Sequence, residues 1–266
     1  MKIHLYTTYY PEKKAARRAE LQQCLTHNLA NKALASITVF NEGGDLSAFA
    51  HKKLRVVPMS QRPTYQDFFE YINQNSPSDH IHIIANTDIY FDEHLGVLKY
   101  LDLEGKALAL SRWDTTGFKQ PQLYNKNSSQ DVWIIKGSIK ATLQAAFPLG
   151  VPRCDNRLMY ELEQAGYEVL NPAYSIKAYH LHEGQRDLVY TEADNVYQIP
   201  PPYRYKYPHN WWGFWKTLWF NRTHQEQLGG YRYDIKKLNN WWVIRLPRKV
   251  LEIVLRKKMP LIGYDA

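Results

Sequence analysis

Cysteine and long hydrophobic runs are both scarce in this sequence. Its 266 residues include only two cysteines, Cys24 and Cys154, which excludes a disulfide framework and is typical of a reducing compartment. No apolar run approaches the ~20 residues that a membrane-spanning helix needs, and the first residues read as a strand and not as an export signal. We therefore expect a cytoplasmic protein, at most peripheral to the inner face of the cell membrane.

Several motifs of well-known enzyme classes are absent as well. The sequence has no P-loop, no Rossmann glycine fingerprint, no G-x-S-x-G, no H-E-x-x-H and no cysteine-rich zinc pattern. With 44% hydrophobic and 23% charged residues, the chain is neither disordered nor collagen-like. Its 266 residues suit one large domain, or one domain with an appendage.

Short apolar runs alternate with amphipathic ones between residues 1 and 190. Periodicity and turn residues predict strands at 2–6, 36–40, 54–57, 80–85, 107–110, 132–135, 168–170 and 175–180, and helices at 11–31, from 63, at 138–146 and at 155–165. This alternation predicts an α/β fold, with a mixed, mostly parallel sheet flanked by helices. In such sheets, ligands bind beyond the carboxyl ends of the strands.

Two groups of carboxylates are candidates for chemistry. Asn86-Thr87-Asp88 follows the most apolar strand, where Asp88 either holds a divalent metal against a diphosphate or caps the next turn. Asp155 opens a helix, where it is either a plain N-cap or a general base. A base there needs burial or a neighbouring acid to raise its pKa.

Two histidines near position 180 form a third candidate. His180 and His182 are two residues apart, so in a strand both imidazoles point to the same face. They are either structural or ligands of a metal such as Mn²⁺.

The order of the short motifs resembles a family of GT-A-type glycosyltransferases encoded among bacterial surface-polysaccharide genes. The resemblance covers roughly residues 1–190 and depends on these pieces: Glu20-Leu21-x-x-Cys24-Leu25-x-x-Asn28, Arg62-x-Thr64-Tyr65-x-Asp67-Phe68, Ala85-Asn86-Thr87-Asp88-Ile89-Tyr90-Phe91-Asp92, Ser111-Arg112-Trp113-Asp114, Ser129-Gln130-Asp131-Val132-Trp133-x-x-Lys136-Gly137, Cys154-Asp155-Asn156-Arg157, Gly166-Tyr167, Asn171-Pro172, Ile176-Lys177 and His180-x-His182. It implies a GT-A-like fold and transfer of a sugar, a hexose or deoxyhexose, from a nucleoside-diphosphate sugar to a hydroxyl of a glycan or lipid-linked acceptor. It also implies a divalent metal, Mn²⁺ or Mg²⁺.

The resemblance assigns roles to particular residues. It implies Asp155 as the catalytic base of an inverting enzyme and Asp88 with His182 as metal ligands. Donor contacts are expected from Arg17, Arg62, Asn86, Asp88 and Arg112, and acceptor-side contacts from Asp131, Asn156 and His180. Arg18 is a further candidate for the diphosphate, and a solvated helix face is the alternative for both Arg17 and Arg18. An ion pair with Asp114 or Asp131 is the alternative for Arg112.

Two positions depart from the family pattern. Asn86 stands where the first acid of a D-x-D motif is expected, which bears on how strictly a metal is needed. Arg153 stands before Cys154 where glycine is expected, so we expect the acceptor side to differ.

The last quarter of the chain is different in composition and has no counterpart in the resemblance. We divide the chain into a catalytic domain, 1–194, and an aromatic, basic extension, 195–266. Pro247 and Pro260 bracket an expected helix whose apolar residues are Val250, Leu251, Val254 and Leu255. This segment either contacts an anionic membrane surface or folds back over the catalytic domain.

Other functions remain open at this point. The net charge of +8 and the many aromatics are compatible with a protein that binds single-stranded nucleic acid, although the candidate site residues cluster at strand ends, so no nucleic acid is expected. Asp88 with the two histidines would also suit a metal-dependent phosphoesterase. A catalytically inactive scaffold is the last alternative.

Overall fold

The computed structural model describes residues 1–115, 120–181, 198–228 and 241–259. Its main feature is a seven-stranded sheet in the order β10-β6-β9-β4-β1-β2-β3. The strands are β1 (Ile3–Tyr9), β2 (Leu34–Asn41), β3 (Leu54–Pro58), β4 (Ile81–Ala85), β6 (Lys106–Leu110), β9 (Val132–Lys136) and β10 (Glu168–Leu170).

The sheet is mixed and mostly parallel. β1 pairs in parallel with β2 and β4, β2 with β3, and β10 with β6. Only β9 runs antiparallel to its neighbours β4 and β6 within this sheet. The α/β fold class expected from the sequence is confirmed.

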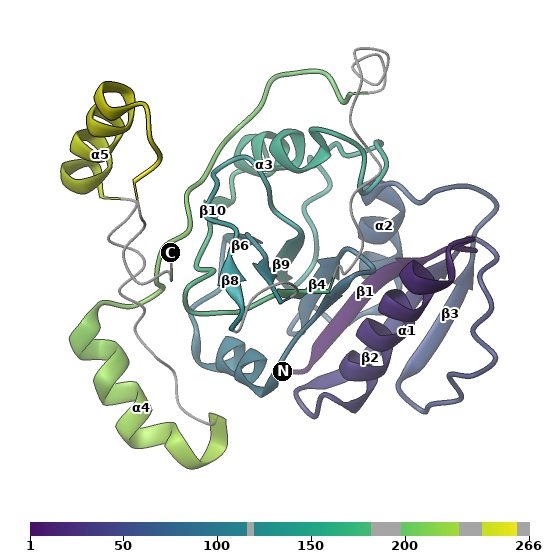
Figure 1. Cartoon of the computed structure of the whole chain (residues 1–266). Coiled ribbons are helices and arrows are strands. Elements are labelled where there is room, and N and C mark those ends of the chain that lie inside the picture. Colours follow the sequence, from purple (N-terminus) through teal and green to yellow (C-terminus); the bar gives the residue numbers. More distant parts are fainter. Residues whose placement is uncertain (116–119, 182–197, 229–240, 260–266) are drawn as a thin grey trace.

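Helices cover both faces of the sheet (Figure 1). One face packs on α1 (Ala15–Ala30) and the 3-10 helix η1 (Glu93–Tyr100), with Leu21, Leu25 and Leu98 in the core. The other face packs on α2 (Tyr65–Asn75) and α3 (Cys154–Gln164), with Phe68 and Leu158. The helices α1, α2 and α3 were expected from the sequence, whereas η1 was not.

Individual residues determine where α2 begins and where α3 ends. Thr64 caps α2 through a reciprocal capping box with Asp67, which satisfies two of the free backbone donors at the helix start. Gly166, expected after the end of the 155–165 helix, has φ +80°. That left-handed conformation terminates a helix with little cost only for glycine.

A second, smaller sheet was not expected. It joins β5 (Ile89–Tyr90), β11 (Tyr179–His180), β7 (Trp113–Asp114) and β8 (Gln122–Leu123) in that order. Two-residue strands carry too little periodicity to be recognised. This sheet pairs His180 with Ile89 on one side and with Asp114 on the other, so it brings three distant segments together.

Two expected elements are wrong in the first 181 residues. Residues 138–146 form turns and no helix, because the amide of Asn73 exchanges both backbone hydrogen bonds with Ile139 and Gly137 holds φ +82° just before. The strand expected at 175–180 is reduced to β11, because Ser175 and Ile176 donate to the carbonyl of Pro172 and form a turn.

Part of the C-terminal extension folds back over the main domain. Ile199 donates to Pro152 and His209 to Asn171 through the backbone. Helix α4 (Phe214–Leu228) then packs on η1, with Phe220 buried against Trp212. The boundary expected at residue 194 lies outside the described residues.

Helix α5 (Trp242–Leu255) begins earlier than expected. Pro247 lies inside the helix and not at its start, where it removes a single backbone donor. Pro260 lies outside the described residues. Val250, Leu251, Val254 and Leu255 all belong to the helix, and all are exposed.

Candidate active site

A cavity of about 890 Å³ lies at the carboxyl ends of β1 and β4. Thr8 near the end of β1 and Asn86, Thr87 and Asp88 after β4 line it. The chain leaves β1 through β2 and β3 toward one edge and then crosses to β4 on the other side of β1. This is the topological switch point at which open α/β sheets bind ligands.

A hydrogen bond between two threonines joins the strands at the switch point. Thr8 Oγ1 lies 2.7 Å from Thr87 Oγ1, and the Thr87 hydroxyl also donates to the Thr8 carbonyl at 3.0 Å. The loop that carries Asp88 is thereby fixed to the end of β1.

Asp88 is held by two cations. Arg17 Nη2 donates to Asp88 Oδ2 at 2.5 Å, and His180 Nε2 lies 3.2 Å from the same oxygen. Arg17 also donates to the buried Glu20 at 2.6 Å. The solvated-face alternative for Arg17 is therefore excluded, because its guanidinium turns inward.

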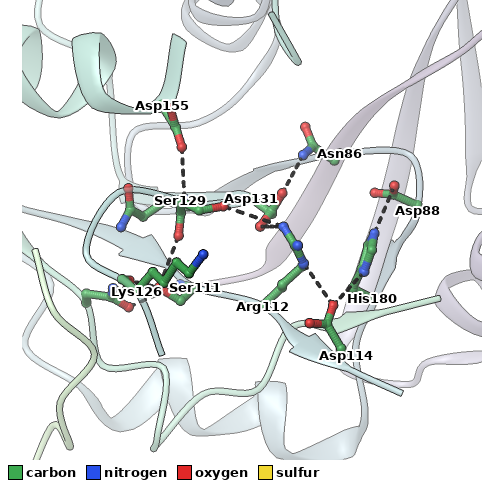
Figure 2. A network of polar contacts seen from close by, with 12 residues as sticks. Asn86, Asp88, Ser111, Arg112, Asp114, Lys126, Ser129, Asp131, Asp155 and His180 are labelled. Carbon is green, nitrogen blue, oxygen red and sulfur yellow. Dashed lines mark hydrogen bonds and ion pairs between the residues drawn. The ribbon is translucent and has the colours of Figure 1, made fainter. Parts of the chain in front are cut away.

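The ion pairs continue from His180 across the floor of the site (Figure 2). His180 Nδ1 lies 2.8 Å from Asp114, which accepts from Arg112 at 2.8 Å. Arg112 also donates to Asp131 at 3.2 Å, and Asn86 donates to the other oxygen of Asp131 at 2.8 Å. Negatively and positively charged side chains alternate along this chain of contacts, so each charged side chain lies next to one of opposite sign.

Burial and pairing together set the charges of the network. Burial alone would raise the pKa of Asp88, but the contacts with His180 and Arg17 hold it far below its usual value. Burial would likewise lower the pKa of His180, but the hydrogen bonds to Asp114 and Asp88 raise it to about 9. Asp88 is therefore ionised and His180 is charged at neutral pH.

Asp155 lies across the cavity from Asp88, in the first turn of α3. Its oxygens accept from the backbone N–H groups of Asn156 at 2.9 Å and Gln130 at 3.2 Å. Burial, with a contribution from the nearby Asp131, nevertheless raises its pKa to about 6. The burial that a base at a helix start requires is present.

The neighbouring Asn156 lines the cavity with an unsatisfied side chain. Its side chain is fully buried, and neither its amide oxygen nor its amide nitrogen has a hydrogen-bond partner among the described residues. Leaving a buried polar group unpaired costs about 1–3 kcal/mol. In proteins, the hydrogen bonds of such a group are completed by a buried water molecule or by a polar ligand.

Two arginines line the same side of the cavity. Arg153 precedes α3 with φ +70°, a left-handed conformation that explains why glycine is expected at this position. Its guanidinium lies 5.7 Å from the centre of the Tyr203 ring. Arg62 lies against Gly150, where a Cβ would stand 2.8 Å from its Nη2.

The structure brings most of the expected site residues to this cavity: Arg17, Arg62, Asn86, Asp88, Asp131, Asp155, Asn156 and His180 line it. Arg112 does not, because it is buried beneath in ion pairs with Asp114 and Asp131. The ion-pair alternative for Arg112 is what the structure shows. His182 lies outside the described residues.

Sequence reasoning missed three residues of the site. Lys14 lines the cavity, Glu20 anchors Arg17, and Asp114 bridges His180 and Arg112. For Glu20 the sequence does contain a signal, because an acidic residue three positions after an arginine on a helix can form an ion pair with it. Asp114 was expected only as a possible ion-pair partner of Arg112, and its contact with His180 had no signal because it depends on the unexpected small sheet.

Asp88 has one carboxylate oxygen that a divalent cation could take, beside the two positive side chains that already neutralise the carboxylate. Among the described residues, Asp88 Oδ1 is buried without a hydrogen-bond partner. Arg17 and His180 both contact the other oxygen, Oδ2. Mg²⁺ and similar ions commonly take one or two protein carboxylates and complete their shell with substrate phosphates and water. Within the part of the chain that the structure describes, no three His, Cys, Asp or Glu side chains are grouped as a metal cluster.

Comparison with known proteins gives matches among solved structures only. No family model matches the sequence, and no curated protein sequence does. TarS of S. aureus matches with a TM-score of 0.48 at 13% identity, over 68% of this chain and 37% of TarS. The mannosyltransferase PcManGT of Pyrobaculum calidifontis, in complex with GDP-Man and Mn²⁺, matches with a TM-score of 0.43 at 13% identity, over 64% of this chain and 54% of that one. A 4-diphosphocytidyl-2C-methyl-D-erythritol synthase matches with a TM-score of 0.40 at 10% identity, over 73% of this chain and 95% of that one. The match thus spans about half of the mannosyltransferase and little more than a third of TarS.

Proposed function

We propose that the protein is an inverting glycosyltransferase that uses a nucleoside-diphosphate sugar as donor. The observation that carries the proposal is one cavity with two unlike sides. Asp155, whose pKa is raised to about 6, lies on one side. Asp88, paired with the positive side chain of Arg17, lies on the other side, at the switch point of the sheet. A base and an anion-binding region facing one another are what transfer from a diphosphate to a hydroxyl requires.

The cations around the cavity suit the donor diphosphate. Arg17 and Lys14 line it from α1 and the residue before that helix, and Arg62 lines it beside Gly150, on the side of α3. A guanidinium binds phosphate oxygens through two parallel hydrogen bonds. Arg17 is held in position by Glu20 and Asp88, so little conformational freedom is lost when the donor binds.

The chemistry follows from the two sides. The acceptor hydroxyl attacks the anomeric carbon of the donor sugar and gives its proton to the carboxylate of Asp155. The bond from that carbon to the diphosphate oxygen breaks, and the diphosphate leaves with the electron pair. Attack opposite the leaving group inverts the anomeric centre. Arg17 and Arg62 stabilise the negative charge that grows on the diphosphate.

Two further groups complete this account. The unpaired amide of Asn156, next to Asp155, holds the acceptor hydroxyl through hydrogen bonds. A divalent cation, Mn²⁺ or Mg²⁺, bound at the free oxygen of Asp88 would supply additional positive charge for the diphosphate.

The finer parts of the proposal come from the motif resemblance. It favours a hexosyl or deoxyhexosyl donor, a glycan or lipid-linked acceptor and a place in bacterial surface-polysaccharide biosynthesis, with residues 1–194 as the catalytic domain. None of these follows from the geometry of the cavity.

A thermal-shift screen tests the donor site. The full chain is melted with nucleoside diphosphates of each base and with the matching nucleotide sugars, with and without Mn²⁺ or Mg²⁺. A ligand that binds the folded state raises the melting temperature by mass action. We expect one base to give a shift that Arg17→Gln removes, while Arg18→Gln, a change at the exposed neighbour, preserves it. No shift with any nucleotide would overturn the proposal.

A further inference from the structure

Helix α5 is oriented opposite to an ordinary amphipathic surface helix. None of its residues is buried, and its most exposed side chains are apolar: Trp242 is 71% exposed, Ile253 76% and Val254 69%. The half-buried residues of the helix are Ile244 and the three polar residues Arg245, Arg248 and Glu252. A surface helix normally places its apolar side on the core. Within the described residues, the apolar side of α5 is instead exposed.

The polar side of α5 faces the body of the protein. Arg245 lies 4.7 Å above the ring of Tyr207, in the segment that leads to α4. At 100° per residue, Arg245, Arg248, Lys249 and Glu252 share one side of the helix, and the remaining side is apolar from Trp242 around to Leu255. The exposed apolar surface is therefore continuous along α5.

Helix α4 presents a second apolar surface of the same kind. Its inner side is anchored, since Thr217 and Phe220 are buried and Phe220 contacts Tyr100 of η1. Its outer side carries Trp215, 78% exposed, and Trp219, 68% exposed, with Phe214 and Leu218 also exposed. Figure 1 shows α4 and α5 on the same side of the molecule, away from α1 and β3.

Basic residues surround these apolar surfaces. Residues 214–228 and 242–258 contain eight Lys or Arg and two Glu, so they carry most of the net charge of the chain. Lys216 and Arg222 of α4 and Lys249 of α5 are exposed, as are Arg256, Lys257 and Lys258 that follow α5. A partner for this surface has to offer apolar contacts beside negative charge.

We propose that α4 and α5 form a docking surface for an anionic lipid bilayer. Tryptophan is favoured at the headgroup level of membranes, and a helix with a broad apolar side and basic borders lies in the interface plane. Each Lys or Arg near an anionic leaflet contributes about 1 kcal/mol. A second copy of this chain suits the surface poorly, because a two-fold contact would place two strongly basic segments against each other.

For this binding, the apolar side chains of α4 and α5 need only enter the headgroup region of the bilayer, and neither helix needs to cross it. Among the described residues, no helix has the length and apolar content of a membrane span. The surface is remote from Asp155 in sequence and uses none of the cavity residues, so this inference is independent of the enzymatic proposal.

Vesicle flotation with the full chain tests the inference. We expect binding to vesicles of phosphatidylcholine mixed with phosphatidylglycerol, little binding to phosphatidylcholine alone, and weaker binding as salt rises. Ile253→Glu should weaken binding at least about tenfold, because it replaces an apolar side chain that the bilayer would bury with a charged one. Its matched control is Val56→Glu, at an exposed valine of β3. This strand lies on the side of the molecule opposite to both helices (Figure 1), so the control should bind as the wild-type chain does.

A second pair of variants separates charge from apolar contact. Lys257→Gln should weaken binding to the anionic vesicles about fivefold, and Lys52→Gln, at another exposed lysine, should not. Because Lys257 and Lys52 are both exposed, both variants should have the melting temperature of the wild-type chain. Blue-shifted tryptophan fluorescence with anionic vesicles gives an independent signal.

Four results would overturn the inference, and three of them come from the vesicle and light-scattering measurements. These are equal binding to both vesicle types, equal effects of Ile253→Glu and Val56→Glu, and a concentration-dependent oligomer in light scattering that Ile253→Glu dissociates. The last would assign the surface to a second copy. Displacement of the protein from vesicles by a single-stranded oligonucleotide at low concentration would assign it to nucleic acid instead.

Discussion

The Nε2 atom of His180 lies 3.2 Å from Oδ2 of Asp88, although 92 residues separate the two. The contact exists because β11 pairs with β5 directly after the Asp88 loop. Arg17 reaches the same oxygen from α1. Three distant segments thus fix one carboxylate at the switch point of the sheet, and the second oxygen of Asp88 is left for a ligand.

Replacing Asn156 with an apolar residue should raise the stability of the fold and lower its activity. Asn156→Leu keeps the side-chain shape and removes two unpaired buried polar atoms, so we expect the free energy of unfolding to rise by on the order of 1 kcal/mol. Activity with the physiological acceptor should fall at least about tenfold, because the acceptor loses its hydrogen bonds. Urea unfolding and initial rates measure the two effects.

Asn171 provides the matched control for this prediction. It is equally buried, but its amide bonds to Ser111 and to the carbonyl of Lys206. Asn171→Leu should therefore lower the free energy of unfolding by about 1–3 kcal/mol. If Asn156→Leu destabilises as much as Asn171→Leu, Asn156 has a structural partner and the acceptor role is wrong.

The left-handed backbone of Arg153 predicts an unusual ranking of two substitutions. Arg153→Gly and Arg153→Ala both remove the contact with Tyr203, but only glycine adopts φ +70° without strain. The glycine variant should be more stable than the alanine variant by about 1 kcal/mol. Equal unfolding free energies of the two variants in urea would show that the position carries no strain.

A histidine cluster at the opposite end of the sheet predicts an acid-labile fold. Burial and the nearby His80 help lower the pKa of His4 to about 4, with Arg55 and Lys2 adding to the effect, and burial beside His4 and His80 lowers the pKa of His82 to about 4. The unfolded chain takes up these protons below about pH 6.5, and the folded chain does so only near pH 4. Stability is therefore full above about pH 6.5 and is lost as the pH falls toward 4.

The variant His82→Gln tests this pH dependence. Glutamine keeps a partner for the Tyr6 hydroxyl, which lies 3.3 Å from His82. Between about pH 7 and pH 5, the variant should lose roughly 2 kcal/mol less unfolding free energy than the original chain. His51→Gln, at an exposed histidine, should leave the loss unchanged. The opposite contribution of Asp155 is common to all three proteins and cancels in the comparison.

Much of the fold follows from the sequence because its strands and helices have strong periodicity. β1, β2, β4, β6 and β9 are apolar runs, and α2 begins with a recognisable capping box. The helix expected at 138–146 fails because Asn73, distant in sequence, takes the backbone bonds of Ile139. Such a tertiary contact leaves no local pattern in the sequence.

The site was predictable where its residues follow strands or open helices. Asp88 and Asp155 stand at such positions, and both line the cavity. The placement of Arg112 was not predictable, because the choice between donor contact and ion pair depends on Asp114 and Asp131 meeting it in space. The exposed apolar side of α5 was likewise hidden, since a helical pattern alone does not say which side faces the protein.

The most direct test of the account is Asp155→Asn, measured for donor binding and for sugar transfer in parallel. With the donor found in the nucleotide screen, the variant should keep the thermal shift of the original chain. Its transfer rate should fall by about 10²–10⁴-fold, and the original rate should decline as the pH drops below about 6, where Asp155 becomes protonated. Undiminished transfer by Asp155→Asn, or a product that retains the donor's anomeric configuration, would contradict the role of Asp155 as the base of an inverting glycosyltransferase.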